Sequence, residues 1–426
     1  MTNSIQNRFW VLRRWNSYTP RVPLVQRGRG GGYYLSWQGK GIVVDPGFDY
    51  LENFQRCGLG INEISAIFIT HSHIDHTDQL ESILMMKYER YDRMRDAGAS
   101  LDPAVDVFMS WDSMTKYSSS INDQPREVLN RPIQSIPRDK TIDLFQYDYP
   151  IKVEPLPVQH TTTAGPSSCD AVGLIFKLYS DFSRSRPLMK IGITSDCKYE
   201  PTVVEYIATK LKECDIVVAH LGTIDIPQLI EHACLQAGDE VIKMCANIDP
   251  KSVERRMLKS LLRSPDTSSI GKDLGRLLAG EKITHARGSH LGFQGLYSVF
   301  QKVFESGSKT KLGIISEFGE ELGSFRHKVT QVLNQAILGT KRGGKGRRIF
   351  TGDIGLAVEL LTEDRRCAGC GKSSIGFLLQ CTSCKSLFCL SCIDDVCIKH
   401  RQKAIFYDCQ SCYEPDFYPK SPLMPL

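Results

Sequence analysis

Short apolar runs, each of the length of a β-strand, recur along the first 362 residues of the chain. The runs cover 9–15, 33–37, 41–47, 65–71, 107–111, 152–158, 173–179, 190–196, 215–222, 311–317 and 357–362. Helical periodicity appears in the segments from about 75 to 95, 201–212, 292–306 and 318–338. Strands dominate the beginning of the chain, and helices alternate with strands further along. This order predicts a layered α/β domain.

Composition adds little to this picture. Of the 426 residues, 41% are hydrophobic and 24% are charged, which allows a large core and is typical of a soluble protein. No apolar run approaches the roughly 20 residues of a membrane helix, and no basic segment followed by an apolar one opens the chain. We therefore expect a cytoplasmic protein that does not cross a membrane. The formal net charge of +5 is too small to indicate nucleic-acid binding by itself.

The cysteines are unevenly distributed. Six of the fifteen are scattered over the first 366 residues, whereas nine lie between Cys367 and Cys412. Without a secretion signal, such a cluster indicates metal ligation before disulfides. The sequence thus predicts a large domain over 1–362 and a small zinc-binding domain over 363–426.

The segment THSHIDHT, residues 70–77, places three histidines and an aspartate directly after an apolar run. His71 and His73 are two apart in extended chain, so their imidazoles can point the same way. Asp75 and His76 follow at a turn into a helix. A lone histidine at a strand end is more often structural, but four such residues together predict a hydrolytic site, in which two metals about 3.5 to 4 Å apart share one oxygen nucleophile.

Two more candidate ligands come from distant segments. His160 follows the apolar run 152–158, and Asp196 closes the run 190–196. Strand-end polar residues are common, and each residue alone is a weak indication. Because both close a β run on the same expected edge, we expect them to join the histidines of the loop.

The order H-x-H-x-D-H, then His, then Asp resembles the metallo-β-lactamase superfamily over roughly residues 10–362. The resemblance implies an αββα sandwich with a two-metal cleft at one edge of the two sheets. It also implies that Asp45, in the run 41–47, orients the ligand loop. The order of motifs is most similar to the phosphodiesterase branch that includes ribonuclease Z.

The resemblance to this branch implies roles for three further residues. His220 takes the place of a strand ending in His-Glu, and His290 resembles a later histidine that helps the leaving oxygen. Glu317 stands where the branch has its last metal-binding histidine. A carboxylate is an acceptable ligand for zinc or for the harder manganese. We expect Glu317 to close the second metal site; alternatively His290 closes it, or the second metal is weakly held. His290 could also be a helix-cap residue.

The expected centre therefore holds two divalent metals, zinc or manganese. The first metal is assigned to His71, His73 and His160; the second to Asp75, His76 and Glu317; Asp196 bridges them. Asp75 is also counted among the catalytic residues, and His290 or His220 is the candidate general acid.

The C-terminal cysteines form four pairs of the type C-x2-C, and a fifth pair ends in histidine. The pairs are Cys367 and Cys370, Cys381 and Cys384, Cys389 and Cys392, Cys397 and His400, and Cys409 and Cys412. Four pairs make two structural zincs. We expect the first and third pairs to share one zinc, and the second pair to join either Cys409 and Cys412 or Cys397 and His400. The arrangement resembles cross-brace modules of the RING and C1-like type, for which we expect docking onto protein or nucleic acid.

Taken together, the motifs predict a two-metal phosphodiester hydrolase, a nuclease acting on RNA or DNA. A basic, glycine-rich stretch containing Lys341, Arg342 and Lys345 either contacts phosphates or is a solvated loop. One alternative is a cyclic-nucleotide phosphodiesterase. An alternative from a different class is a non-catalytic, zinc-dependent adaptor. The oligomeric state is left open.

Overall fold

The computed structural model describes eleven segments of the chain. They are 7–15, 30–102, 104–122, 127–160, 171–183, 185–222, 290–318, 326–339, 346–374, 376–381 and 386–393. Several predicted site residues lie outside these segments, namely Lys341, Arg342, Lys345, Cys384, Cys397, His400, Cys409 and Cys412.

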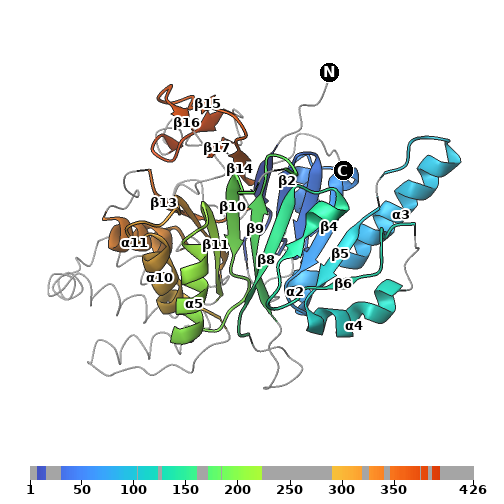
Figure 1. Cartoon of the computed structure of the whole chain (residues 1–426), viewed down its shortest axis with the longest axis horizontal. Helices are drawn as coiled ribbons and strands as arrows, with labels where there is room; N and C mark the ends of the chain where they lie inside the picture. The colour runs from blue at the N-terminus through green and yellow to red at the C-terminus, as the bar shows by residue number, and fades with distance from the viewer. Residues whose placement is uncertain are drawn as a thin grey trace, which may run out of the picture.

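Two β-sheets form the centre of the molecule (Figure 1). In the described residues the first sheet has nine strands in the order β18-β17-β14-β1-β2-β3-β4-β5-β6. Its strands are β1 (Arg8–Val11), β2 (Tyr33–Trp37), β3 (Lys40–Val44), β4 (Ile64–Ile69), β5 (Asp106–Met109), β6 (Gln134–Ser135), β14 (Leu356–Leu360), β17 (Phe377–Gln380) and β18 (Leu387–Phe388).

The second sheet has seven strands in the order β13-β12-β11-β10-β9-β8-β7. They are β7 (Ile142–Asp143), β8 (Ile151–Pro157), β9 (Val172–Leu178), β10 (Met189–Ile193), β11 (Ile216–Gly222), β12 (Leu312–Phe318) and β13 (Arg348–Thr351). Strands β10 to β13 run parallel to one another. Because the carboxyl ends of parallel strands meet at one edge, side chains that follow these strands gather there.

Helices cover the outer face of each sheet (Figure 1). The helices are α1 (Tyr50–Arg56), α2 (Ile74–Thr77), α3 (Leu80–Asp96), α4 (Trp111–Asn122), α5 (Pro201–Leu211), α10 (Gly292–Val303) and α11 (Arg326–Leu338), with short 3₁₀ turns at Ile61–Glu63 and Leu144–Tyr147. α5, α10 and α11 share an apolar core with the second sheet, and α1, α3 and α4 share another with the first. The predicted αββα sandwich is therefore confirmed. None of the described helices combines the length and apolarity required to cross a bilayer.

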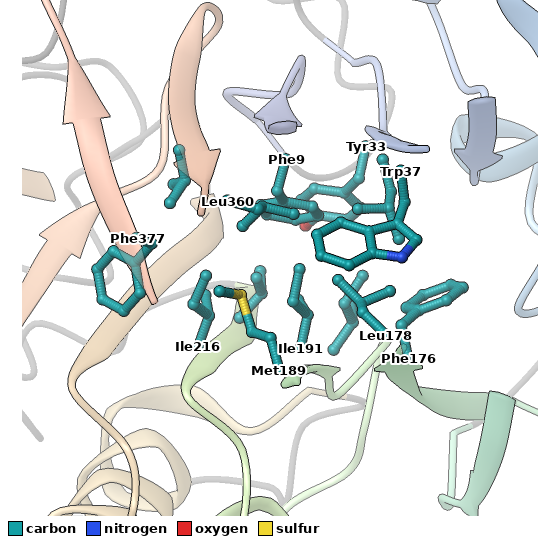
Figure 2. Packing of buried hydrophobic residues seen from close by; sticks show 14 of the residues in the cluster. Phe9, Tyr33, Trp37, Phe176, Leu178, Met189, Ile191, Ile216, Leu360 and Phe377 are labelled. Carbon is teal, nitrogen blue, oxygen red and sulfur yellow. The ribbon is translucent and has the colours of Figure 1, made fainter. Parts of the chain in front are cut away.

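The largest core lies between the two sheets. Figure 2 shows Phe9, Tyr33 and Trp37 of the first sheet facing Leu178 and Ile191 of the second. In β1 the side chains alternate: Phe9 and Val11 face the other sheet, and their neighbours face the helices. Because both faces of β1 are buried, the sequence shows a continuous apolar run here.

All eleven apolar runs contain a strand, but some elements were missed. α1 is only seven residues long, too short for helical periodicity to stand out. The run at 107–111 is not a strand throughout: β5 ends at Met109, and helix α4 begins at Trp111. Strand β13 follows the basic stretch and was also missed.

The Cys-rich segment continues the first sheet. β17 pairs with β14 in the register Val358 with Leu379 and Leu360 with Phe377. These side chains belong to the core between the sheets. A second pair of short strands, β15 (Arg365–Arg366) and β16 (Ser373–Ser374), lies beyond it. The division of the chain at residue 362 stays a prediction.

Candidate metal centre

Strand ends from both sheets bring three histidines together. His71 and His73 follow β4, and His160 follows β8. Nδ1 of His73 lies 3.2 Å from Nε2 of His71 and 3.2 Å from Nε2 of His160. Their nitrogens and a carboxylate oxygen of Asp196 lie within 4.8 Å of one another. The structure thus assembles the predicted first ligand group.

The donor set of this group fits a divalent metal. Two ligand nitrogens that each bind zinc at 2.0 to 2.1 Å in a tetrahedron lie about 3.3 Å apart, close to the spacing seen here. Burial lowers the pKa of His71 well below its usual value. Burial and the neighbouring His160 lower the pKa of His73 to about 4. Both rings are therefore neutral at neutral pH, which is the protonation state that binds metal.

Asp196 lies at the centre of the site. Its Oδ2 is 3.6 Å from Nε2 of His71, 3.5 Å from Nε2 of His76 and 3.2 Å from Nε2 of His290. Its Oδ1 is 3.0 Å from Nδ1 of His220. Burial opposes ionisation, but the surrounding histidines hold the pKa of Asp196 well below its usual range. Asp196 belongs to both ligand groups, which is the position expected of a bridging carboxylate.

A second group combines His76, Asp196 and Glu317, whose ligand atoms also lie within 4.8 Å of one another. Nε2 of His76 is 3.6 Å from Oε1 of Glu317 and 3.5 Å from Oδ2 of Asp75. Neither oxygen of Glu317 accepts a hydrogen bond of regular geometry from the described residues, and both are buried. The predicted second set therefore converges, with Asp75 at its margin.

Arg13 reaches this second group and was missed by the sequence reasoning. Its guanidinium is fully buried and forms ion pairs of 3.0 Å with Asp75 and with Glu317. One signal was available: in the alternation of the run 9–15, Arg13 follows Phe9 and Val11 on the side that faces the other sheet. A charged residue in that row is unusual, because unpaired burial of a charge is costly.

Asp45 anchors the ligand loop, as the resemblance implied. Its carboxylate accepts hydrogen bonds from the backbone N–H of Thr70 at 2.7 Å and from the hydroxyl of Thr70 at 2.6 Å. The same carboxylate lies 3.0 Å from Nδ1 of His76. Because Nδ1 is held there, Nε2 of His76 points toward Asp196 and Glu317.

Three non-glycine residues at the centre have left-handed backbone conformations. Asp45, Ser195 and Glu317 have φ angles of 51°, 58° and 56°. Each costs conformational energy, about 1 to 3 kcal/mol, and such residues persist only where surrounding contacts impose them. The strain lies at three strand ends that carry the site, which indicates that the packing forces these side chains inward.

The two candidate general acids, His220 and His290, differ in their exposure to solvent. His220 is 1% exposed, and its Nε2 lies 2.8 Å from the hydroxyl of Tyr33. The side chain of His290 is 19% exposed, just before α10. Of these two candidates, only His290 therefore reaches the surface.

Helix α4 packs against the ligand loop. Lys116 donates a hydrogen bond of 2.7 Å from Nζ to the carbonyl oxygen of Ser72. The hydroxyls of Tyr117 and Thr77 lie 2.6 Å apart. Trp111, the first residue of α4, is 63% exposed. This wall of the site was not predicted, because nothing in the run 107–111 marks the start of a helix.

The first and third cysteine pairs also come together. The sulfurs of Cys367, Cys370, Cys389 and Cys392 lie within 4.8 Å of one another. Backbone N–H groups of Gly369 and Cys389 point at Sγ of Cys367 from 3.3 and 3.4 Å. Burial opposes ionisation, but these donors lower the pKa of Cys367 to about 6, which favours the thiolate that zinc binds.

This four-cysteine cluster is compatible with one structural zinc. The second predicted zinc includes Cys381, which is buried, but its other ligands lie outside the described residues. The second zinc and the docking role stay predictions.

Comparison with known proteins yields short matches among curated sequences. The ribonuclease Z of Thermobifida fusca is 33% identical over 63 residues, which are 15% of this chain and 20% of that protein. The ribonuclease Z of Chlamydia trachomatis is 40% identical over 55 residues, 13% of this chain and 18% of that protein. This chain thus matches only about a fifth of the length of these relatives.

The chain is also similar to solved structures. The metallo-beta-lactamase fold protein YhfI from Bacillus subtilis has a TM-score of 0.48 at 8% identity, with 82% of this chain and 98% of that chain covered. The short form of human tRNase Z has a TM-score of 0.38 at 12% identity, with 74% and 93% covered.

Residues 40–255 match the family described as "Beta-lactamase superfamily domain". This region is about half of the chain and contains the histidine loop, His160 and Asp196. The sandwich of two sheets and the ligand groups at the strand ends agree with that match. The chain therefore belongs to the metallo-β-lactamase superfamily.

Proposed function

We propose that this chain is a metal-dependent phosphodiester hydrolase, and that it acts as a nuclease on RNA or DNA. The observation that carries the proposal is the convergence of three imidazole nitrogens and the Asp196 carboxylate at one edge of the two sheets. The ribonuclease Z relatives, although they match over a short stretch, support a polynucleotide as the substrate.

The residues of the centre have different roles in the proposed reaction. His71, His73, His160 and Asp196 would hold a divalent ion. When bound, such an ion supplies a Lewis acid that polarises a phosphoryl oxygen and lowers the pKa of water. Asp45 keeps the ligand loop in place through Thr70. His220, fixed between Tyr33 and Asp196, orients the carboxylate.

We assign proton donation to His290 rather than to His220. Nε2 of His290 lies 3.2 Å from Asp196, and its side chain reaches the surface. A protonated ring here can give its proton to the oxygen that leaves when the phosphodiester bond breaks. His220 has no comparable access, because it is buried.

A first experiment tests whether the centre hydrolyses phosphodiesters. His73→Ala removes a ligand, and Ser72→Ala is a matched control in the same loop, because the contact of Ser72 with α4 uses its backbone oxygen. Both variants and the wild type are assayed on bis(p-nitrophenyl) phosphate, single-stranded RNA and single-stranded DNA. We expect His73→Ala to lose more than about 100-fold in kcat/KM on all active substrates, and Ser72→Ala to lose little. Equal turnover by wild type and His73→Ala would remove the catalytic proposal and favour the adaptor.

A second experiment tests the role of His290. The nitrophenolate group leaves without a proton, whereas the alkoxide of a ribose needs one. His290→Ala should therefore lower RNA or DNA cleavage about 10²- to 10⁴-fold and change hydrolysis of bis(p-nitrophenyl) phosphate much less. An equal loss on both kinds of substrate would contradict proton donation. Cleavage of cyclic nucleotides alone, by the wild type, would favour the cyclic-nucleotide phosphodiesterase.

A further inference from the structure

Arg13 is the one arginine that the described residues place inside the metal centre. It lies just beyond β1, and none of its surface is exposed. Nε donates a hydrogen bond of 3.2 Å to the carbonyl oxygen of Trp15, which fixes the direction of the side chain. The two terminal nitrogens then point into the second ligand group.

The guanidinium contacts the same atoms that a second metal would need. Nη2 lies 3.0 Å from Oδ2 of Asp75, and Nη1 lies 3.0 Å from Oε1 of Glu317. Those two oxygens are the ones that approach Nε2 of His76, at 3.5 and 3.6 Å. The guanidinium also lies 3.4 Å from each ring nitrogen of His76. The three side chains predicted for the second metal, Asp75, His76 and Glu317, thus all contact one cation.

Charge explains why these residues occur together. Glu317 adds a buried negative charge at a position where the resemblance implied a neutral histidine. A buried carboxylate requires a partner, and a guanidinium is permanently charged and suited to bridge two carboxylates. A divalent ion at the same place would be repelled by Arg13 at short range, without water to screen the charges. The contacts of the guanidinium given above are with Asp75, His76 and Glu317, and none of them is with His71, His73 or His160 of the first group.

We propose that the guanidinium of Arg13 is the resident cation of the second position, so that this centre binds one divalent ion, on His71, His73, His160 and Asp196. Arg13 acts as a positioning residue, because it holds Asp75 and Glu317 in place. The inference concerns metal occupancy. It relies on metal binding by the first group, as the proposed function does, and it does not depend on which substrate is hydrolysed.

The wild-type protein provides the first test. Crystals of the full chain grown with zinc are measured at the zinc absorption edge, and anomalous difference maps locate the ions. Apart from peaks at the C-terminal cysteines, we expect a single peak, between His71, His73 and His160, and none between His76 and Glu317. Two peaks about 4 Å apart, the spacing of a two-metal site, would overturn the proposal.

Zinc counting provides the second test. Because the C-terminal cysteines also bind zinc in our interpretation, differences between variants are compared rather than totals. Arg13→Gln should gain one zinc per chain, since Asp75, His76 and Glu317 lose their cation. Arg14→Gln is the matched control: Nε of Arg14 pairs with Asp353 at 2.6 Å, outside the ligand groups, and we expect no gain.

A folded Arg13→Gln that gains no zinc would also overturn the proposal. If Arg13→Gln does not fold, the double variant Arg13→Gln with Glu317→His, which restores the charge balance, takes its place and should gain one zinc. Hydrolysis of bis(p-nitrophenyl) phosphate is measured separately on the same preparations. A single-ion protein that does not hydrolyse it supports this inference and counts against the proposed function, so the two failures are distinguishable.

Discussion

Leu379 joins the Cys-rich segment to the main core, and its truncation measures how far the two depend on each other. It lies in β17, paired with Val358 of β14 on one side and with Phe388 of β18 on the other. Its exposure is 1%. Leu379→Ala removes three carbon atoms from the core between the sheets. We therefore expect the whole sandwich, and not only the cysteine cluster, to lose stability.

The size of the loss follows from burial. At about 0.8 kcal/mol per buried methylene, the lost transfer free energy is about 2.4 kcal/mol. The cavity left between two sheets adds to this, and the free energy of unfolding should fall by about 3 kcal/mol. Leu188→Ala is the matched control, because Leu188 is 45% exposed and should change stability by less than about 1 kcal/mol.

Tryptophan fluorescence during urea unfolding is a suitable assay. All four tryptophans precede residue 112, so the signal reports on the first part of the chain. Trp37, which is fully buried in β2, lies in the same core as Leu379. A shift of the tryptophan midpoint in Leu379→Ala is expected. An unchanged midpoint, with unfolding of the C-terminal segment alone, would refute the reasoning and show that the segment is an independent domain.

Three other predictions concern the cysteine cluster, a buried lysine and the wall of the site. Cys370→Ser should bind one zinc fewer per chain by elemental analysis and unfold at lower urea than Cys57→Ser, which lies outside the cluster; equal zinc contents would contradict a four-cysteine site. Burial lowers the pKa of Lys87 to about 8 from 10.5, so the unfolded chain binds more protons between these values and stability rises with pH. From pH 8 to pH 10, the free energy of unfolding of the wild type should rise by about 2 kcal/mol more than that of Lys87→Met, as measured by urea unfolding. If the free energies of the two proteins change with pH in parallel, the pKa of Lys87 is not lowered. Trp111→Ala should raise KM for RNA or DNA about tenfold or more, because a base can no longer stack on the exposed ring, and should leave KM for bis(p-nitrophenyl) phosphate unchanged. Phe182→Ala, at another exposed aromatic residue, should change neither value. Equal KM values of wild type and Trp111→Ala for RNA or DNA would show that Trp111 does not contact the substrate.

The strands were predictable because their signal is local. The run at 65–71, for example, overlaps β4, whose residues are all buried between two parallel neighbours, so that the apolar run is continuous. The ligand loop was predictable for the same reason, since His71, His73, Asp75 and His76 are consecutive or nearly so. His160 and Asp196 could be placed because each follows a strand and strand ends meet at one edge.

Other features depend on contacts between distant segments. Arg13 is explained only by its contacts with Asp75 and Glu317, which are far away in the sequence. Likewise, no local pattern marks β17 as a continuation of the first sheet, because its partner β14 is chosen by the packing of side chains. The left-handed backbone at Glu317 is of this kind too, since a run of apolar residues such as 311–317 predicts extended chain throughout.

Glu317, which replaces the histidine expected at its position, and Arg13, which pairs with it, are best understood together. A carboxylate at the end of β12 is buried completely and held by strained backbone, so it cannot turn to solvent to recover its hydration. Arg13 offsets that penalty because the chain after β1 runs beside the end of β12, where Trp15 pairs with Phe318, and the guanidinium reaches Glu317 from there. Without Arg13, Glu317 would lose its permanently charged partner, and without Glu317, Arg13 would keep only one of its two carboxylates, that of Asp75. Removing one partner of a buried ion pair costs several kcal/mol. It follows that Glu317→His without a change at Arg13 should be more damaging than the two changes made together.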